Sequence, residues 1–180
     1  EWKLLSSALY EQNGVVTPES FHRCIQLISL KKNGEIFTGY NQNDSQEFLQ
    51  FLLEHLHTGL SKEVNMNING TAKNKLDKMA IQALTNWKQY FKNDYSKIID
   101  MYYGQFYSKI TTPDDNDYIT ETYDPFSNIS LELIEKPNLT IYDCFDNFCK
   151  YEAIDFVVKE NDTNKYKRSL NIWRFPNHLI

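Results

Sequence analysis

The sequence contains few cysteines and no long run of apolar residues. Cys24, Cys144 and Cys149 are widely spaced along 180 residues and form no C-x-x-C pair, so the spacing predicts neither a disulfide framework nor a cysteine zinc site. This cysteine usage favours a reducing intracellular compartment, cytoplasmic or nuclear. No segment is long and apolar enough to cross a bilayer, and no signal-like region opens the chain. We therefore expect no membrane partner.

Basic charge is also scarce. The chain has 19 Lys and Arg against 24 Asp and Glu, which gives a net charge of -5. Nucleic-acid-binding proteins usually carry a basic face, so this balance argues against a nucleic-acid partner. The balance suits a partner with a positive segment, but a mildly acidic charge is also ordinary for soluble proteins.

Helical spacing of apolar residues dominates the first half of the chain. It predicts a helix over residues 2–12. A second helix is expected to have Thr17 as its N-cap and Pro18 at its first position, and to stop at Asn33-Gly34. A further helix is expected along the apolar side that begins at Met79, followed by a short helical turn. Ser96 is expected to cap the short turn. The residues expected on the apolar side of the longer helix are Met79, Ala83, Trp87, Tyr90 and Phe91.

The stretch DSQE, residues 44–47, predicts the start of a third helix before these two. In this capping-box pattern Asp44 accepts from the N–H of Glu47, and Glu47 reaches back to the N–H of Asp44. Both acids also suit the positive end of the helix dipole. The apolar stripe that follows consists of Phe48, Leu49, Leu52, Leu53, Leu56 and Leu60.

From Gly104 onward the apolar period changes from helical spacing to strict alternation. This predicts strands over 104–110, 117–123 and 127–134, a helix capped by Thr140 that runs through 154, a strand–turn–strand over 156–173, and a further strand from 175. Helices first and a mostly antiparallel sheet later define an α+β class. We predict one partial domain, 1–180, with a mainly helical part, 1–103, and a β-rich part, 104–180.

No complete active site is visible in the residues themselves. A catalytic cysteine needs a base beside it, but all three cysteines fall inside predicted helices, and no motif aims a histidine at them. His55 and His57 are expected to have packing or surface roles on the third helix. The acids Asp114, Asp115 and Asp117 indicate a solvated turn rather than a metal site. The chain also lacks G-x-S-x-G, H-E-x-x-H and glycine-rich phosphate loops.

The stretch FTGYNQNDSQEFLQFLLEHLH, residues 37–57, resembles the second conserved box of the ubiquitin-specific proteases, the cysteine-protease family of deubiquitinases. Four later stretches resemble that family in the same order, so the resemblance covers residues 17–180. They are NWKQYFKNDYSKIIDMYYGQFYSKI, YDPFSNISLELI, LTIYDCFDNFCKYEAI (with Leu139, Cys144, Phe145, Phe148 and Glu152 in place) and LNIWRFPNHLI.

The resemblance implies a papain-like fold of which this chain forms part of the thumb, fingers and palm. The family's nucleophile box is expected before residue 1 and its catalytic histidine box after residue 180, so we expect no catalytic residue in this chain. Family members normally carry two C-x-x-C pairs that hold zinc in the fingers. Here the corresponding stretches read ITTPDDND and FVVKEND, so we expect no metal and no other cofactor.

The resemblance also implies ubiquitin, or a ubiquitinated protein, as the partner. Asp44 and Glu47 are expected to pair with arginines of ubiquitin's basic C-terminal tail, and Gln46 to hydrogen-bond its backbone. The alternative is that Asp44 and Glu47 only cap their helix, although the two roles can coexist. The leading function is the central segment of an isopeptide-hydrolysing deubiquitinase. The alternatives are a non-catalytic ubiquitin-binding or scaffold module and a plain structural domain. The sequence predicts no oligomeric state.

Overall fold

The computed structural model describes residues 1–11, 13–31, 36–39, 41–112, 118–155 and 165–180. These residues form two compact units, Glu1–His55 and Leu56–Ile180, and each is described by itself. The predicted division into 1–103 and 104–180 stays a prediction. No helix in the described part of the chain is long and apolar enough to cross a membrane.

The first unit contains α1 (Trp2–Glu11), α2 (Glu19–Lys31) and most of α3 (Ser45–Leu60). Helix α2 begins one residue later than predicted, because the carbonyl of Pro18 accepts the first helical bond, from the His22 N–H, at 2.8 Å. The predicted stop at Asn33-Gly34 lies outside the described residues. Ile25 is the most buried apolar side chain of α2, and the ring of Phe21 contacts Trp2 with centroids 5.7 Å apart.

The second unit contains two further helices, α4 (Lys75–Phe91) and α5 (Lys97–Tyr102). Asn74 caps α4 in a complete capping box with Asp77, and Ser96 caps α5 as predicted. Ala83 and Trp87 are buried, which confirms the expected apolar side of α4 there. Tyr90 departs from that expectation, because its ring is exposed and its hydroxyl donates to Asp124 at 3.0 Å.

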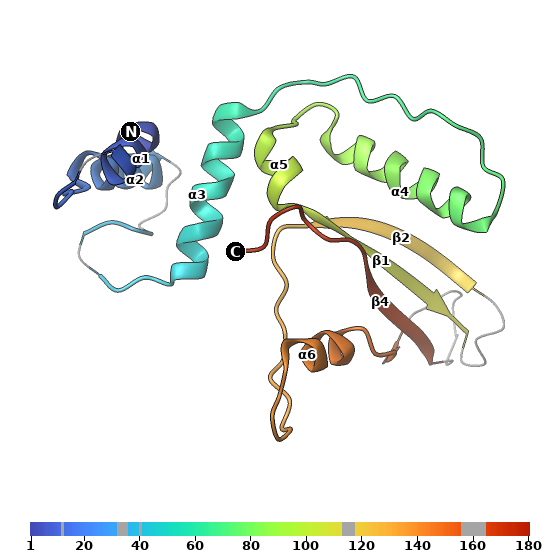
Figure 1. Ribbon diagram of the computed structural model, residues 1–180. Helices are drawn as coiled ribbons and strands as arrows, with labels where there is room; N and C mark the ends of the chain where they lie inside the picture. The colour runs from blue at the N-terminus through green and yellow to red at the C-terminus, as the bar shows by residue number, and fades with distance from the viewer. Residues whose placement is uncertain (12, 32–35, 40, 113–117, 156–164) are drawn as a thin grey trace. The chain divides into compact units, whose positions relative to one another are not determined.

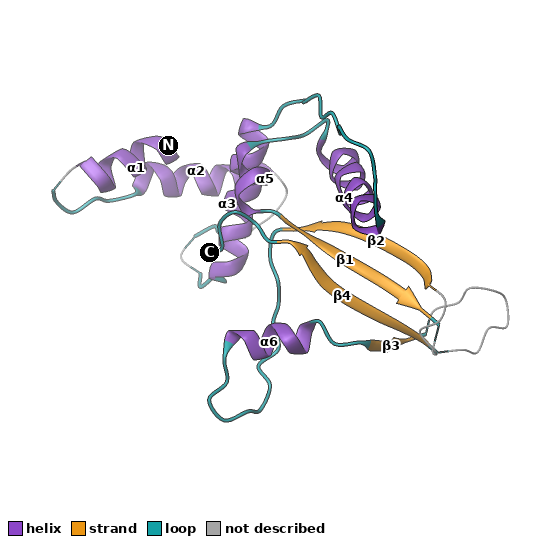
Figure 2. Cartoon of the chain, turned by 45° about the vertical axis from the view of Figure 1, so that its right-hand side comes forward, coloured by secondary structure: helices purple, strands orange, loops and turns teal. Residues whose placement is uncertain are grey.

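A four-stranded antiparallel sheet forms the centre of this unit, with the strand order β2-β1-β4-β3. In both views α4 lies on one side of the sheet and α6 (Ile141–Phe148) on the other (Figures 1 and 2). Tyr123 is fully buried beside Tyr107 and Trp173, and Phe106 stacks on Phe126. The α+β class with an antiparallel sheet is thus confirmed. The strands are β1 (Gly104–Thr111), β2 (Tyr118–Phe126), β3 (Glu152–Ile154) and β4 (Tyr166–Arg174).

Three local predictions in the β-rich part were wrong. Residues 127–134 and 175–180 form no strand, because alternation only describes an extended chain and a strand also needs a hydrogen-bonded neighbour. The helix capped by Thr140 ends at Phe148 rather than 154, so Cys149 follows the helix instead of lying inside it. Residues 152–154 pair with β4 instead. The strand and turn predicted over 156–164 lie outside the described residues.

Candidate functional site

The acidic start of α3 is built as the capping pattern predicts. Oδ1 of Asp44 accepts from the backbone N–H groups of Gln46, at 2.7 Å, and of Glu47, at 3.0 Å. These are two of the four N–H groups that a helix leaves unpaired at its first turn. The return bond from the Asp44 N–H to Glu47 stays a prediction.

All three side chains expected to bind the ubiquitin tail, those of Asp44, Gln46 and Glu47, are exposed. Within the described residues, Oδ2 of Asp44 has no hydrogen-bond partner, and the side chains of Gln46 and Glu47 have none. The cap therefore uses one oxygen of Asp44 and leaves two carboxylates and an amide facing solvent at a helix N-terminus.

A groove of about 550 Å³ lies beside this first turn. Apolar and polar residues both line it, and all its lining residues belong to the first unit. Asp44 lines the groove, whereas Gln46 and Glu47 are not among its lining residues, so the structure brings only one of the three predicted residues to it. The lining consists of Pro18, Phe21, His22, Ile25, Phe37, Gly39, Asn41, Asn43, Asp44, Ser45 and Phe48.

Phe37 reaches the groove with an unusual backbone. Its φ is 60°, in the left-handed region that a bulky residue rarely adopts. Such a conformation costs on the order of 1–3 kcal/mol and persists only when the surroundings hold it. Its ring is 7% exposed and meets Phe48 and Phe51 edge-on, with centroids 5.4 and 5.1 Å apart. The sequence did not predict a role for this residue, because no local pattern indicates that an aromatic residue has a left-handed backbone conformation.

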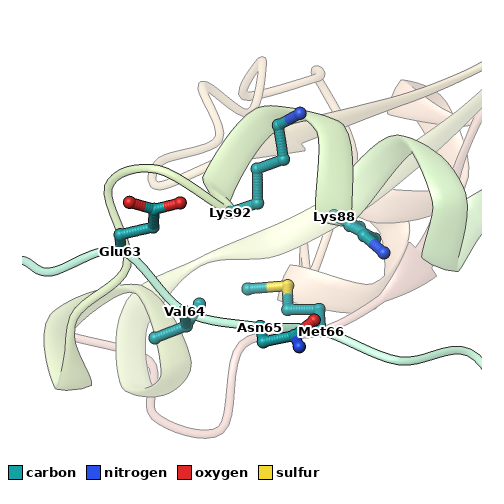
Figure 3. A pocket seen from close by; sticks show the side chains of 6 residues that line it. All are labelled: Glu63, Val64, Asn65, Met66, Lys88 and Lys92. Atoms are coloured by element: carbon teal, nitrogen blue, oxygen red, sulfur yellow. The ribbon is translucent and has the colours of Figure 1, made fainter.

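A second, smaller pocket of about 440 Å³ lies in the other unit. It lies between the end of α4 and the extended segment 63–66. Backbone hydrogen bonds join this part of the chain to the turn after α4. The Lys62 and Tyr95 backbones exchange hydrogen bonds of 2.9 and 3.0 Å, and the Val64 N–H donates to the Lys92 carbonyl. Figure 3 shows Lys88 and Lys92 extending from the helix, opposite Glu63, Val64, Asn65 and Met66. Charges of both signs at a surface depression indicate no particular ligand.

His57, Ser96 and Asp94 meet in an arrangement that superficially resembles a catalytic triad. Nδ1 of His57 lies 2.8 Å from the Ser96 hydroxyl and Nε2 lies 3.3 Å from Asp94. Ser96, however, is 3% exposed, and its oxygen already accepts from the N–H groups at the start of α5. A nucleophile must be reachable by its substrate. His57 therefore ties the end of α3 to the cap of α5, which confirms its predicted packing role.

The three cysteines do not form a nucleophilic site in the described part of the chain. Cys144 is buried, Cys24 and Cys149 are half-buried, and no histidine is hydrogen-bonded to any of them there. Burial raises the pKa of the Cys149 thiol, which disfavours the thiolate that such chemistry requires.

The zinc site that the family resemblance suggests is not supported by the residues at its two stretches. Neither 110–117 nor 156–162 contains a cysteine, and thiolates are the ligands that family members use. Among the described residues no group of three or more His, Cys, Asp or Glu side chains is arranged to hold a metal ion. Most of both stretches lies outside the described residues, so the expectation of no zinc stays a prediction.

The arrangement of helices and antiparallel sheet is that of ubiquitin-specific protease catalytic domains. A structure of the SAGA Ubp8/Sgf11/Sus1/Sgf73 DUB module bound to ubiquitin aldehyde matches with a TM-score of 0.52 and 23% identity, over 86% of this chain and 28% of that chain. Another structure of this module matches with a TM-score of 0.60 and 20% identity, over 96% of this chain and 33% of that one. At these identities the likeness shows the fold.

The sequence defines the family. The family model described as ubiquitin carboxyl-terminal hydrolase matches residues 1–180, and the chain belongs to this family. Human ubiquitin carboxyl-terminal hydrolase 2 is 31% identical over 177 residues, which cover 93% of this chain and 28% of that protein. Ubiquitin carboxyl-terminal hydrolase 4 of Saccharomyces cerevisiae is 30% identical over 159 residues, covering 81% and 17%. The chain thus spans less than a third of the length of these relatives.

Proposed function

We propose that this chain is the central segment of a deubiquitinase domain. It binds ubiquitin and, together with residues outside the chain, hydrolyses isopeptide bonds after ubiquitin's C-terminal glycine. Family membership over all 180 residues supports this, as does the ubiquitin aldehyde bound to a structural neighbour. The inactive scaffold is not favoured, because the matched relatives are named as hydrolases. We place this activity in the cytoplasm or nucleus.

The observation that carries the proposal is the exposed acidic turn at the start of α3. Asp44 and Glu47 pair with arginines of ubiquitin's tail, and Gln46 hydrogen-bonds its backbone. The open Oδ2 of Asp44 and the unengaged groups of its neighbours, within the described residues, support these roles. An exposed ion pair contributes about 0.2–1 kcal/mol, whereas a desolvated charged hydrogen bond contributes about 1.5–3 kcal/mol.

Replacing Asp44 by asparagine separates the two roles of this residue. Asparagine caps a helix as well as aspartate does, so Asp44→Asn keeps the cap and removes only the charge. We expect this variant to bind ubiquitin about tenfold more weakly, equivalent to about 1.4 kcal/mol, and to show a smaller salt dependence of binding, because the charge of Glu47 remains. Titration calorimetry at two salt concentrations measures both effects, and circular dichroism checks that the helix content is unchanged.

Asp77→Asn is the matched control, because Asp77 is also an acid at a helix start, in the capping box of α4. It should leave ubiquitin affinity unchanged. If Asp44→Asn binds as tightly as the unaltered chain, Asp44 serves only as a cap. If the unaltered, folded protein does not bind ubiquitin at all, the proposed function is wrong.

A further inference from the structure

An aromatic ring from the residues that precede α3 packs against this helix. Phe37 has a φ of 60° and is nearly buried, and its ring packs against Phe48 and Phe51, one helical turn apart on α3. On the other side of the loop the Ser29 hydroxyl of α2 donates to the carbonyl of Ile36. The residue in the unfavourable conformation is thus flanked by contacts to two helices.

The Phe37 ring is linked to the acidic turn through one intervening residue, Phe48. Its partner Phe48 donates its backbone N–H to the carbonyl of Asp44, at 3.0 Å. The Asp44 side chain in turn holds the N–H groups of Gln46 and Glu47. Phe37, Phe48 and Asp44 also line the same groove. A displacement of the Phe37 ring would therefore reach the turn through one aromatic contact and one hydrogen bond.

The residues before α3 also supply polar lining of the groove. Gly39, like Phe37, has a positive φ, of 69°. Asn41 and Asn43 then line the groove beside Asp44, and the Asn43 amide donates to the Asn41 carbonyl at 2.9 Å. If this position needed only a left-handed backbone, glycine would adopt it without strain. The ring contacts are what keep Phe37 there.

We propose that Phe37 is a positioning residue for the ubiquitin-tail site. Its ring clamps the described residues 36–39 and 41–43 to the first two turns of α3 and so holds the acidic turn, Asn41 and Asn43 in one arrangement. The proposal rests on the proposed function of Asp44, but its structural part can be measured without ubiquitin.

The first experiment follows the backbone amides of Gln46 and Glu47 by hydrogen exchange in the protein. Phe37→Ala should raise their exchange rates by at least about tenfold relative to the unaltered protein, an opening easier by about 1.4 kcal/mol. Phe37→Leu, which retains an apolar side chain, should restore most of the protection. Leu30→Ala is the control, because Leu30 is a 57% exposed apolar residue on α2, and should leave both amides unchanged.

The second experiment is a double-mutant cycle for ubiquitin binding. Phe37→Ala should weaken binding to about the extent of Asp44→Asn, and the combined variant should bind no more weakly than either single variant, because both act through the same contact. Salt dependence should fall in Phe37→Ala as it does in Asp44→Asn, although Phe37 carries no charge. A residue that only adds stability would not change the salt dependence.

The outcomes are distinct. Protected amides in Phe37→Ala, or strictly additive losses in the cycle, overturn the positioning role. Unprotected amides in a protein that does not bind ubiquitin keep the positioning role and overturn the proposed function. If Phe37→Ala does not fold, Phe37→Leu and Phe37→Met take its place, and amide exchange and salt dependence equal to those of the unaltered protein in both then overturn the proposal.

Discussion

Asp143 shows how much one carboxylate does at the start of a helix. It receives a hydrogen bond from Lys136, and both the hydroxyl and the backbone N–H of Thr140 donate to it. The Lys136 contact is the main cause, and the two Thr140 bonds the next, of a pKa of about 2 against the ordinary 3.8. Because Thr140 is the N-cap of α6, ionised Asp143 stabilises the first turn of that helix.

The pH dependence of this contribution follows from the sign of the shift. The pKa is depressed in the folded chain, so the stabilisation is complete above pH 3.8, declines as the pH falls and is gone below about pH 2. We expect the amide resonances of Thr140 and Asp143 to titrate over this window in NMR spectra. Asp143→Asn should abolish that transition. A midpoint near pH 4 would show that the Lys136 contact does not persist in solution.

The residues of the candidate site differ in how far they could be foreseen. The role of Asp44 as a cap follows from local chemistry, because a cap depends only on groups within a few residues. For His57 the sequence predicted a packing or surface role, but its partner Ser96 lies 39 residues further along the chain. Phe37 could not be foreseen in this way. Its conformation depends on ring contacts with a helix more than ten residues further along the chain, and no local propensity carries that information.

At the scale of elements, β1 begins where the sheet leaves room for only a glycine. A Cβ placed on Gly104 would lie 2.7 Å from the carbonyl oxygen of Arg174 and would also meet the Phe126 ring. Both neighbours belong to the strands that flank β1, and the Arg174 carbonyl cannot withdraw without disturbing the ladder.

We expect Gly104→Ala to lower the free energy of unfolding by about 1–3 kcal/mol, the usual cost of overpacking. Gly59→Ala is the matched control, because Gly59 lies within α3 and has no atom within 4 Å of an added Cβ. That substitution should raise stability by up to about 1 kcal/mol. Urea denaturation of the two variants, followed by circular dichroism, measures the difference. Equal stability would mean that the sheet relaxes around Gly104.

The elements that were predicted wrongly share one physical cause. Helices make their hydrogen bonds internally, so caps locate their starts well, as Ser96 does for α5 and Thr140 for α6. A strand needs a neighbour from elsewhere in the chain. Residues 127–134 alternate as a strand should, with Ile129 and Leu131 half-buried, yet no strand among the described residues pairs with them. Conversely, the short β3 was missed because Glu152–Ile154 continue a helical pattern, and only their pairing with β4 makes them a strand.

At the scale of the whole molecule, the described residues include the exposed acidic turn of α3 and show no complete site for hydrolysis. None of the cysteines is hydrogen-bonded to a histidine in the described part of the chain, and in the serine–histidine–aspartate contact the serine is buried at a helix cap. We therefore expect the purified chain to bind ubiquitin but to leave a fluorogenic ubiquitin C-terminal amide uncleaved. Turnover that disappears after alkylation of the thiols would contradict this.

The fully buried Tyr123 gives the sheet a built-in optical reporter. Its hydroxyl has no hydrogen-bond partner among the described residues, and burial, with Glu121 as a smaller cause, raises its pKa above the ordinary 10.0. The phenolate absorbs differently from the phenol, so an alkaline titration watched in the ultraviolet registers this ring late, when the strands around it part. Opening of the sheet can thus be timed without a label, against the exposed tyrosines Tyr10 and Tyr142 of the same chain.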